Sequence, residues 1–285
     1  MTSRIACILV PLFPLAARLR SEPELSGEAV AILAGSGNAA RIVAASRTAR
    51  RAGILVGFSL SQARAMLPRL IARGSDPVCE RSAQEALLEA AETLSPRIED
   101  AGNGLVYLDA EGMERFFPSE RSLGQSLAAA VEGVGLPARI GVAGSKLAAR
   151  VGAESPDSPL CVPPGREAAF LSPLPLSRLL TTAPATPPAF TGRSNSCHNS
   201  WRGAGGEEKS VEVLDTLARW GVRTVGEFAK LPEGEVVARL GEAGRRLHLT
   251  ARGIDPRPLL PRTALPSFAE GMDLEWPLVA VEPFL

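Results

Sequence analysis

The sequence predicts an α+β fold followed by a small all-helical domain, and three observations support this prediction. Apolar runs that suit buried strands alternate with amphipathic helical periodicity through residues 1–180, in a βαββαβ-like order that predicts helices on one face of a sheet. Residues 181–209 are rich in Pro, Thr, Ser, Asn and Gly and have almost no aliphatic side chains, which is typical of a linker or a surface insertion. From residue 210 the pattern is helical, with glycines and a proline between the segments.

The expected elements of the first part follow from local pattern. Residues 5–10 form an apolar run that suits a buried strand and is closed by Pro11 and Pro14. The helix that we expect over 59–66 has Ser59 as its N-cap. The other expected strands are 29–33, 41–45, 105–108 and 138–143, and the other expected helices are 46–52, 83–94, 122–131 and 145–151.

The second part reads as four short helices over 211–220, 224–231, 233–240 and 243–252, separated by Gly221, Pro232 and Gly241. We therefore divide the chain into residues 1–180, a polar linker 181–209, a helical domain 210–262 and a further connection 263–285. Within the first domain, residues from about 29 to 75 form a distinct subregion.

Composition limits the class of protein. The chain has 285 residues, 45% of them hydrophobic and 22% charged, which suffices to bury a core in two or three domains. It has no apolar stretch of the roughly 18 to 20 residues that a membrane span needs, and residues 1–20 have no signal-peptide cleavage pattern. We therefore expect a cytoplasmic protein. The four cysteines are scattered without C-x-x-C spacing, so they predict neither a zinc site nor a disulfide framework.

Charge is unevenly distributed although the formal net charge is zero. Residues 29–75 contain no acidic side chain, while the stretch that follows is acidic. A basic subregion beside an acidic one suits contact with a polyanion on one face. The arginines of the basic subregion are Arg41, Arg47, Arg50, Arg51, Arg64, Arg69 and Arg73.

The segment 214–240 has the layout of a helix-hairpin-helix, with a Gly-Val-Arg-Thr turn between two helices. Backbone N–H groups at such a turn and at the following helix N-terminus can hold a DNA phosphate without reading a base. The residues that we expect at this DNA contact are Gly221, Arg223, Thr224, Gly226 and Lys230. The alternative is an ordinary helical pair with a glycine C-cap at Gly221, and the segment alone does not choose between the two.

Three other features carry less chemical information. Lys146 stands in the first turn of a helix after a strand, in GVAGSKLAAR, which lacks both the G-x-G-x-x-G and the Walker spacing, so the lysine is either a phosphate contact or an ordinary structural residue. His198 and His248 have no nucleophile or metal partner at diagnostic spacing, which argues against a histidine-based hydrolase. Trp201, in the polar linker, is either a base-stacking residue or an incidental exposed aromatic.

Taken in order, the segments of the chain resemble the Y-family translesion DNA polymerases, and most closely the ImuB-type branch of bacterial mutasome operons. RIACILVPLFPLAARL is similar to the segment with the family's first metal-binding Asp, and GLVYLDAEGMERFF is similar to its second acidic palm motif. ARIVAASRTARRAGILVGFSLSQARAMLP resembles the fingers, and ARIGVAGSKLAARVGA resembles the palm strand and helix with its lysine. CVPPGREAAFLSPLPLSRL and GVRTVGEFAKLP resemble the passage from palm to thumb and the thumb hairpin.

The resemblance implies a palm with fingers over 1–180, a helix-hairpin-helix thumb over 210–262, and at 263–285 the start of a linker to a little-finger domain. It also implies roles for single residues. Arg50 matches an arginine that contacts the incoming triphosphate in active relatives, and Lys146 matches a palm lysine near it. Arg47 departs from the pattern, because active relatives usually have a tyrosine there. We interpret Arg50 and Lys146 as remnants of a phosphate site, with plain salt bridges as the alternative.

The departures at the metal site are decisive for this interpretation. Leu9 stands at the position of the first metal-binding Asp, with Pro11 where a second acid often lies, and Gly104 and Leu105 stand at the acidic pair of the second motif. Magnesium binds hard oxygen ligands, usually carboxylates, which these side chains lack. The sequence therefore predicts a polymerase-like frame without catalytic residues, metal or other cofactor.

The predicted function is that of a noncatalytic DNA-binding adaptor in damage-induced translesion synthesis and DNA repair, located at the nucleoid. The partners that the resemblance implies are primer-template or damaged DNA, the sliding clamp, a RecA-like accessory protein and an error-prone replicative-type polymerase. Two alternatives stay open. One is an active error-prone polymerase that binds Mg²⁺ through Asp100, Asp109 or Glu111, and the other is a protein-interaction scaffold that does not bind DNA.

Overall fold

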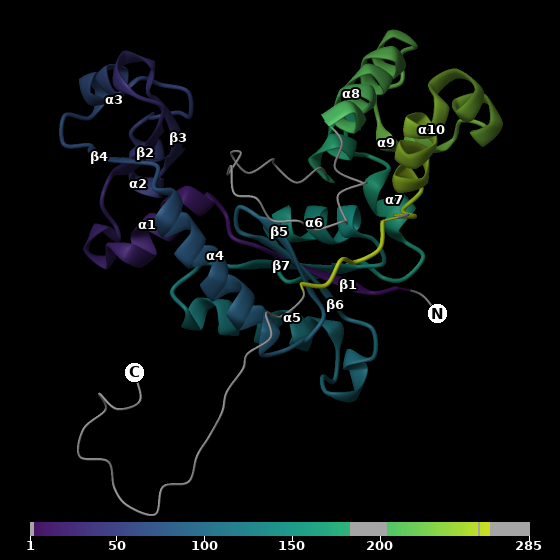
Figure 1. Ribbon diagram of the computed structural model, residues 1–285, viewed down its shortest axis with the longest axis horizontal. Helices are drawn as coiled ribbons and strands as arrows, with labels where there is room; N and C mark the ends of the chain where they lie inside the picture. The colour runs from purple at the N-terminus through teal and green to yellow at the C-terminus, as the bar shows by residue number, and fades with distance from the viewer. Residues whose placement is uncertain (1–2, 183–203, 256, 263–285) are drawn as a thin grey trace, which may run out of the picture.

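The computed structural model describes residues 3–182, 204–255 and 257–262 (Figure 1). A five-stranded sheet with the order β5-β6-β1-β7-β8 forms the centre of the molecule, and β1 lies between antiparallel β6 and β7. Its strands are β1 (Ile5–Leu9), β5 (Ile98–Gly102), β6 (Leu105–Asp109), β7 (Arg139–Ala143) and β8 (Leu160–Cys161).

Helices cover both faces of this sheet, which corrects the expectation of helices on one face. Helices α4 (Pro77–Glu92) and α5 (Glu120–Gly133) pack on the face that carries Ala6 and Ile8, whereas α6 (Lys146–Glu154) packs on the face that carries Cys7. The physical reason lies in the central strand, because residues 5–8 are all buried. A continuous apolar run is typical of a strand with two covered faces, whereas alternation is typical of one covered face.

A second, three-stranded sheet with the order β3-β2-β4 lies within the subregion predicted over about 29–75, and Figure 1 shows it apart from the central sheet. It comprises β2 (Val30–Ala34), β3 (Arg41–Ala45) and β4 (Ile71–Gly74), with the helices α2 (Arg47–Arg51) and α3 (Leu60–Met66). Ser59 caps α3 in a capping box with Gln62, as expected for its N-cap.

The helix α1 (Phe13–Ser21) connects the two sheets and was not predicted, because two nearby prolines indicated only the end of a strand. Pro14 lies at the start of the helix, where a missing N–H costs no hydrogen bond, so it begins the helix and does not break it. Arg18 of α1 donates to Glu22 (2.9 Å) and to the carbonyl oxygen of Gly74 (3.1 Å), and it pairs with Asp76 (3.4 Å). These contacts fasten the second sheet to the first domain.

The helical part is built from α7 (Glu167–Leu171), the 3-10 segment Leu176–Thr182, α8 (Ala204–Arg219), α9 (Val225–Ala229) and α10 (Glu233–Ala251). Since α8 begins at Ala204, residues 204–209 of the predicted linker are helical, while 183–203 lie outside the described residues together with Cys197, His198 and Trp201. The expected helices 233–240 and 243–252 form α10, with a kink at Gly241 (φ 64°, ψ −159°). One apolar cluster contains Tyr107 of β6 and Leu147 of α6 together with Leu217 of α8 and Phe228 of α9. It joins the central sheet to the helical part.

After α10 the chain returns to the central sheet, and residues 257–262 run beside β5 (Figure 1). These residues belong by their contacts to the first domain, although the sequence placed them in the helical one. In the described ranges, no helix has the length and apolar character to cross a membrane.

Candidate functional site

The structure brings together the three positions at which the sequence predicts lost metal ligands. Leu9 and Leu105 are paired residues on the neighbouring strands β1 and β6. The carbonyl oxygen of Gly104 accepts a hydrogen bond of 2.8 Å from the backbone N–H of Val10. Leu9, Gly104 and Leu105 therefore lie side by side at one end of the central sheet.

Apolar groups fill the space around these positions. Leu105 is 6% exposed, and Leu9 packs against the same apolar cluster. Gly104 is buried with φ +76°, and a Cβ atom added there would lie 2.6 Å from Cδ2 of Phe13. The N–H of Gly104 donates to the side chain of Gln84 at 2.8 Å. The residues present do not fit a magnesium ion, because they offer no carboxylate and leave no room for one at position 104.

The acids that could replace the missing carboxylates lie elsewhere or have other partners. Asp109 pairs with Ile5 at the opposite end of β6, where it forms an ion pair with Arg97 (2.7 Å) and accepts from the N–H of Glu111 (3.0 Å). Asp100 accepts from Gln84 (2.7 Å) and from the N–H of Gly102 (2.8 Å). Across the described ranges, no three His, Cys, Asp or Glu side chains are grouped so as to hold a metal ion.

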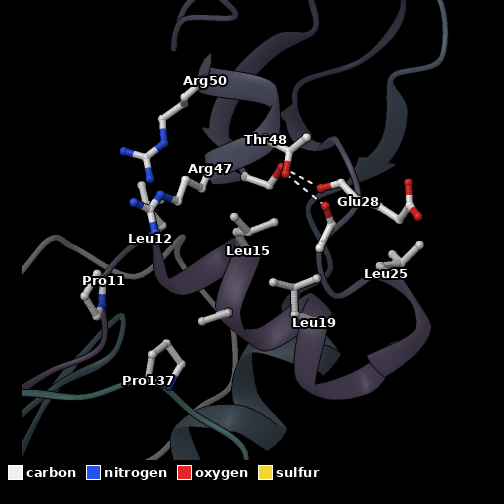
Figure 2. Close-up of a pocket in the computed structure, with 13 residues that line it drawn as sticks. Pro11, Leu12, Leu15, Leu19, Leu25, Glu28, Arg47, Thr48, Arg50 and Pro137 are labelled. Atoms are coloured by element: carbon white, nitrogen blue, oxygen red, sulfur yellow. Dashed lines mark hydrogen bonds between the residues drawn. The ribbon is translucent and has the colours of Figure 1, made fainter. Parts of the chain in front are cut away.

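A pocket of about 260 Å³ lies between α1 and α2 (Figure 2). Its apolar lining includes Leu12, Leu15 and Leu19, and Arg47 and Arg50 extend over it from α2 in the same direction, toward Leu12 and Pro11. Both arginines are exposed. The arrangement offers an apolar hollow with two cationic groups at its rim, which suits a ligand with an anionic group.

The start of α2, the helix that carries Arg47 and Arg50, is fixed to the neighbouring sheet by Ser46. Ser46 is the N-cap and accepts from the N–H of Ala49 at 3.3 Å. Its hydroxyl also donates to the carbonyl oxygen of Glu28 (2.8 Å) and accepts from the N–H of Val30 (3.0 Å). One serine therefore satisfies the helix end and joins it to β2.

Most arginines of the predicted basic subregion are exposed. Arg73 is the exception, because it is half-buried and donates to Glu22 at 2.9 Å. Residues 29–75 contain no acidic side chain, although Glu28 also lines the pocket beside Arg47 and Arg50. The exposed arginines of this subregion are Arg41, Arg47, Arg50, Arg51, Arg64 and Arg69.

Lys146 does not line the pocket that Arg50 lines. It is buried, and its Nζ lies 2.6 Å from Oε2 of Glu99 and 2.8 Å from the carbonyl oxygen of Pro258. The glycine that opens GVAGSK serves packing, because a Cβ at Gly141 would lie 2.0 Å from the carbonyl oxygen of Ala149 on α6. The structure thus shows the structural alternative for Lys146, as one half of a buried ion pair.

At the predicted thumb hairpin, protein groups already occupy the backbone N–H groups. The N–H groups of Arg223 and Thr224 donate to Oε2 of Glu227 at 2.7 and 3.0 Å, and the N–H of Glu227 donates to the hydroxyl of Thr224 at 3.2 Å. The next donors, the N–H groups of Val225 and Gly226, bind the carbonyl oxygens of Leu174 (2.9 Å) and Ser172 (3.0 Å).

The geometry of this turn is therefore that of the alternative, a helical pair with Gly221 (φ +83°) after α8. The carboxylate of Glu227 stands where a phosphate would have to bind, and the two N–H groups that it accepts from hold its pKa below the ordinary value. Arg223 and Lys230 are exposed, so only their side chains remain open to a DNA phosphate.

A second glycine turn in the same domain lies beside exposed arginines. Gly241 separates the two halves of α10, and Arg245, Arg246 and Arg252 are exposed on the half that follows. Arg245 and Arg252 each lie 3.5 to 3.6 Å from Glu233. The signal was present in the sequence, since a glycine followed by paired arginines divides two predicted helices there.

The profile of the impB/mucB/samB family matches residues 8–154, which include the central sheet and the basic subregion. The chain belongs to this family. It is accordingly a relative of the Y-family DNA polymerases. Below we call the central sheet with its helices the palm, residues 29–75 the fingers and α8 to α10 the thumb.

Members of the family that resemble the chain include DNA polymerase IV of Streptomyces coelicolor, which is 30% identical over 84% of this chain and 46% of that protein. DNA polymerase IV of Desulfatibacillum aliphaticivorans is 26% identical over 90% of this chain and 58% of that protein. The chain thus spans about half the length of the curated relatives that it matches. The crystal structure of DinB from Sulfolobus solfataricus shares the fold, with a TM-score of 0.64, 17% identity, and coverage of 90% of this chain and 69% of that one.

Proposed function

We propose that this chain is a noncatalytic, ImuB-type member of the impB/mucB/samB family that binds primer-template DNA as an adaptor in damage-induced translesion synthesis. The observation that supports this most strongly is the apolar filling of the palm at Leu9, Gly104 and Leu105. Leu9, Gly104 and Leu105 offer no carboxylate, and the nearby Asp100 already accepts from Gln84 and from the N–H of Gly102, so we propose that no metal ion neutralises the charge that develops on the phosphates during nucleotide transfer.

Binding to DNA is supported by the exposed arginines of the fingers. A cluster of exposed cations attracts the phosphate backbone and releases its counterions, which requires no base-specific contact. Arg47 and Arg50 are the residues that we propose as phosphate contacts at the pocket, and Arg223 and Lys230 are those that we propose on the thumb. Lys146 joins them only when it is released from Glu99.

The remaining partners rest on the resemblance to the ImuB-type branch. They are the sliding clamp, a RecA-like accessory protein and an error-prone replicative-type polymerase that adds the nucleotides. A cytoplasmic, nucleoid-associated location follows from the same proposal.

Single-nucleotide primer extension by the purified chain, with Mg²⁺ or Mn²⁺, tests the proposal. DNA polymerase IV of Streptomyces coelicolor serves as the positive control, and primer-template binding is measured on the same samples. We expect no extension and retained binding. Extension that disappears in the Asp109→Ala/Glu111→Ala variant would establish an active polymerase with other ligands, and absence of binding even at low salt would leave a scaffold without DNA.

A further inference from the structure

The segment that leaves the thumb, residues 257–262, crosses back over the palm and is called the exit strap below (Figure 1). Its course begins at a locked turn after α10. The Asp255 side chain, only 2% exposed, accepts from Nε (2.8 Å) and Nη2 (2.6 Å) of Arg257. Gly253 (φ +78°) lies so close to α7 that a Cβ there would be 2.6 Å from Cβ of Glu167. The strap therefore leaves the thumb in a fixed direction.

The middle of the exit strap shares one carboxylate with the palm lysine. Oε2 of Glu99 accepts from Nζ of Lys146 and from the N–H of Leu260, each at 2.6 Å. Nζ of Lys146 also donates to the carbonyl oxygen of Pro258 at 2.8 Å, and it lies 5.7 Å from the ring centroid of Tyr107. The lysine is thus bound between the palm and the strap.

The far end of the exit strap is attached to the edge of the palm sheet. The N–H of Arg262 donates to the carbonyl oxygen of Ile98 on β5 at 2.6 Å, and its guanidinium binds Glu85 on α4 at 2.8 Å. Leu259 packs against the apolar cluster shared by palm and thumb. The strap covers part of a free sheet edge, whose unpaired backbone groups would otherwise face solvent.

Lys146 and Glu99 form a buried ion pair. Their side chains are 6% and 17% exposed. An ammonium group has three donors, and two of them here bind the carboxylate and the strap carbonyl. A buried ion pair is held only while both partners stay together, because either charge alone would be left without compensation. While the strap is docked, one donor of Lys146 stays with the strap carbonyl and the ammonium group stays buried.

Polar contacts hold the strap, and Leu259 is the apolar strap residue that packs against the cluster shared by palm and thumb. Pro258, Leu260 and Pro261 are exposed, so few apolar contacts resist removal of the strap. We propose that the exit strap is a gate over Lys146. In the docked state one donor of Lys146 binds the carbonyl oxygen of Pro258 on the strap, and when the strap is displaced that donor becomes available to a phosphate group. This inference rests on the proposed function, because it gives the palm of a DNA-binding adaptor a regulated phosphate contact.

One substitution opens the gate without touching either charge. Leu260→Pro removes the N–H that donates to Glu99, and Leu260→Ala keeps that N–H while shortening the same exposed side chain, so the two variants form a matched pair. Two probes separate the sources of phosphate. Inorganic tripolyphosphate, measured by isothermal titration calorimetry, reports a nucleotide-like polyphosphate, and a fluorescent primer-template reports the DNA backbone.

We expect Leu260→Pro to bind at least one probe about tenfold more tightly than Leu260→Ala, which should behave as the unaltered chain. Adding Lys146→Met to Leu260→Pro should remove the gain. Hydrogen exchange at Arg262 should be slow in the unaltered chain and fast in Leu260→Pro.

Equal binding of both probes by the two Leu260 variants would overturn the gate, as would a gain that persists in the Lys146→Met background. Failure of the proposed function has a different signature, namely no binding of primer-template by the unaltered chain at low salt. In that case the tripolyphosphate comparison still decides the gate.

Discussion

Gly104 is the position at which the packing leaves no room for a metal-binding side chain. The ring of Phe13 occupies the space in which a side chain at this position would lie. The positive φ of Gly104 is common for glycine, is found less often for asparagine and aspartate, and is disfavoured for other residues. A single substitution to an acid therefore does not restore a ligand, because Phe13 would have to move as well.

We predict that Gly104→Asp lowers the free energy of unfolding by about 2 to 4 kcal/mol, from the contact with Phe13 and the burial of a carboxyl group. Asn103→Asp is the matched control, because the neighbouring residue also has a positive φ (52°) but is exposed. Its effect should stay within about 0.5 kcal/mol. Equal effects of the two changes in urea denaturation would contradict the account of Phe13.

His248 is a residue whose polarity the thumb does not use. It is 1% exposed, its ring packs edge-on against Phe228 at 5.3 Å, and within the described residues neither ring nitrogen has a hydrogen-bond partner. Thr250, two residues further along α10, is also buried but donates to the carbonyl oxygen of Arg246 at 2.9 Å. Both side chains are buried, but of the two only that of Thr250 has a hydrogen-bond partner among the described residues.

The two residues should therefore respond to apolar replacement with opposite signs. His248→Leu should raise the free energy of unfolding by about 1 to 2 kcal/mol, because it removes buried donors and acceptors that lack partners. Thr250→Val should lower the free energy of unfolding by about 1 kcal/mol, because it removes the hydrogen bond to the carbonyl oxygen of Arg246. Thermal unfolding of both variants measures the difference, and a destabilised His248→Leu would show that the imidazole has a partner in solution.

At the scale of elements, the junction between fingers and palm depends on ionised carboxylates. Hydrogen bonds from Arg73, and then from Arg18, hold the pKa of Glu22 below its ordinary value. The N–H groups of Cys79 and Val78, with a smaller effect of Arg18, lower that of Asp76. A carboxyl group whose pKa is lower in the folded state stabilises that state above its unfolded pKa, and the stabilisation disappears as the pH falls through the folded pKa.

We predict that the free energy of unfolding falls as the pH is lowered below about 4.5, the ordinary value for Glu22, and that Glu22→Gln makes this fall shallower. Glu24→Gln, which neutralises an exposed carboxylate in the same turn, is the control and should leave the slope unchanged. Chemical denaturation at a series of pH values gives the comparison. Identical slopes for the two variants would show that the junction does not depend on Glu22.

The elements also show which parts of the fold the sequence can predict. The strand 41–45 and the capped helix that follows Ser59 were predicted because their apolar pattern and caps are local signals. The strand β5 was missed because its residues, IEDAG, lack the apolar pattern of a strand, and they become one only by pairing with β6. The kink of α10 was predicted as a boundary between two helices, because Gly241 interrupts the helical sequence pattern at the residue where the helix bends.

The candidate site was predictable only in part, for the same reason. The positions Leu9, Gly104 and Leu105 follow from a resemblance in sequence, but the contact of Phe13 with Gly104 depends on the packing of α1. Lys146 was interpreted as a phosphate remnant because the partner that occupies it, Glu99, is far away in sequence and the strap that covers it is further still. The N–H groups of Arg223 and Thr224 donate to the side chain of Glu227 in the following short helix. The sequence T-x-x-E does indicate the capping box that Thr224 and Glu227 form.

At the scale of the whole molecule, we propose a palm without metal ligands and fingers whose exposed arginines bind DNA. Each phosphate contact releases counterions, so DNA affinity should fall with added salt. We predict that Arg47→Ala/Arg50→Ala weakens primer-template binding and makes the slope of log affinity against log salt shallower by about 2. Arg115→Ala, on an exposed turn of the palm, is the control, and an equal effect of this change would contradict a contact at the fingers.

The central claim is that the palm holds no divalent metal ion, and Mn²⁺ binding measured by electron paramagnetic resonance tests it most directly. Free Mn²⁺ is titrated into the chain with primer-template and a nonhydrolysable nucleotide, beside the same mixture without protein and beside DNA polymerase IV of Streptomyces coelicolor. The account predicts the same free Mn²⁺ signal with the chain as without protein. A stoichiometric loss of that signal that depends on the chain would contradict it and would show that the palm binds metal after all.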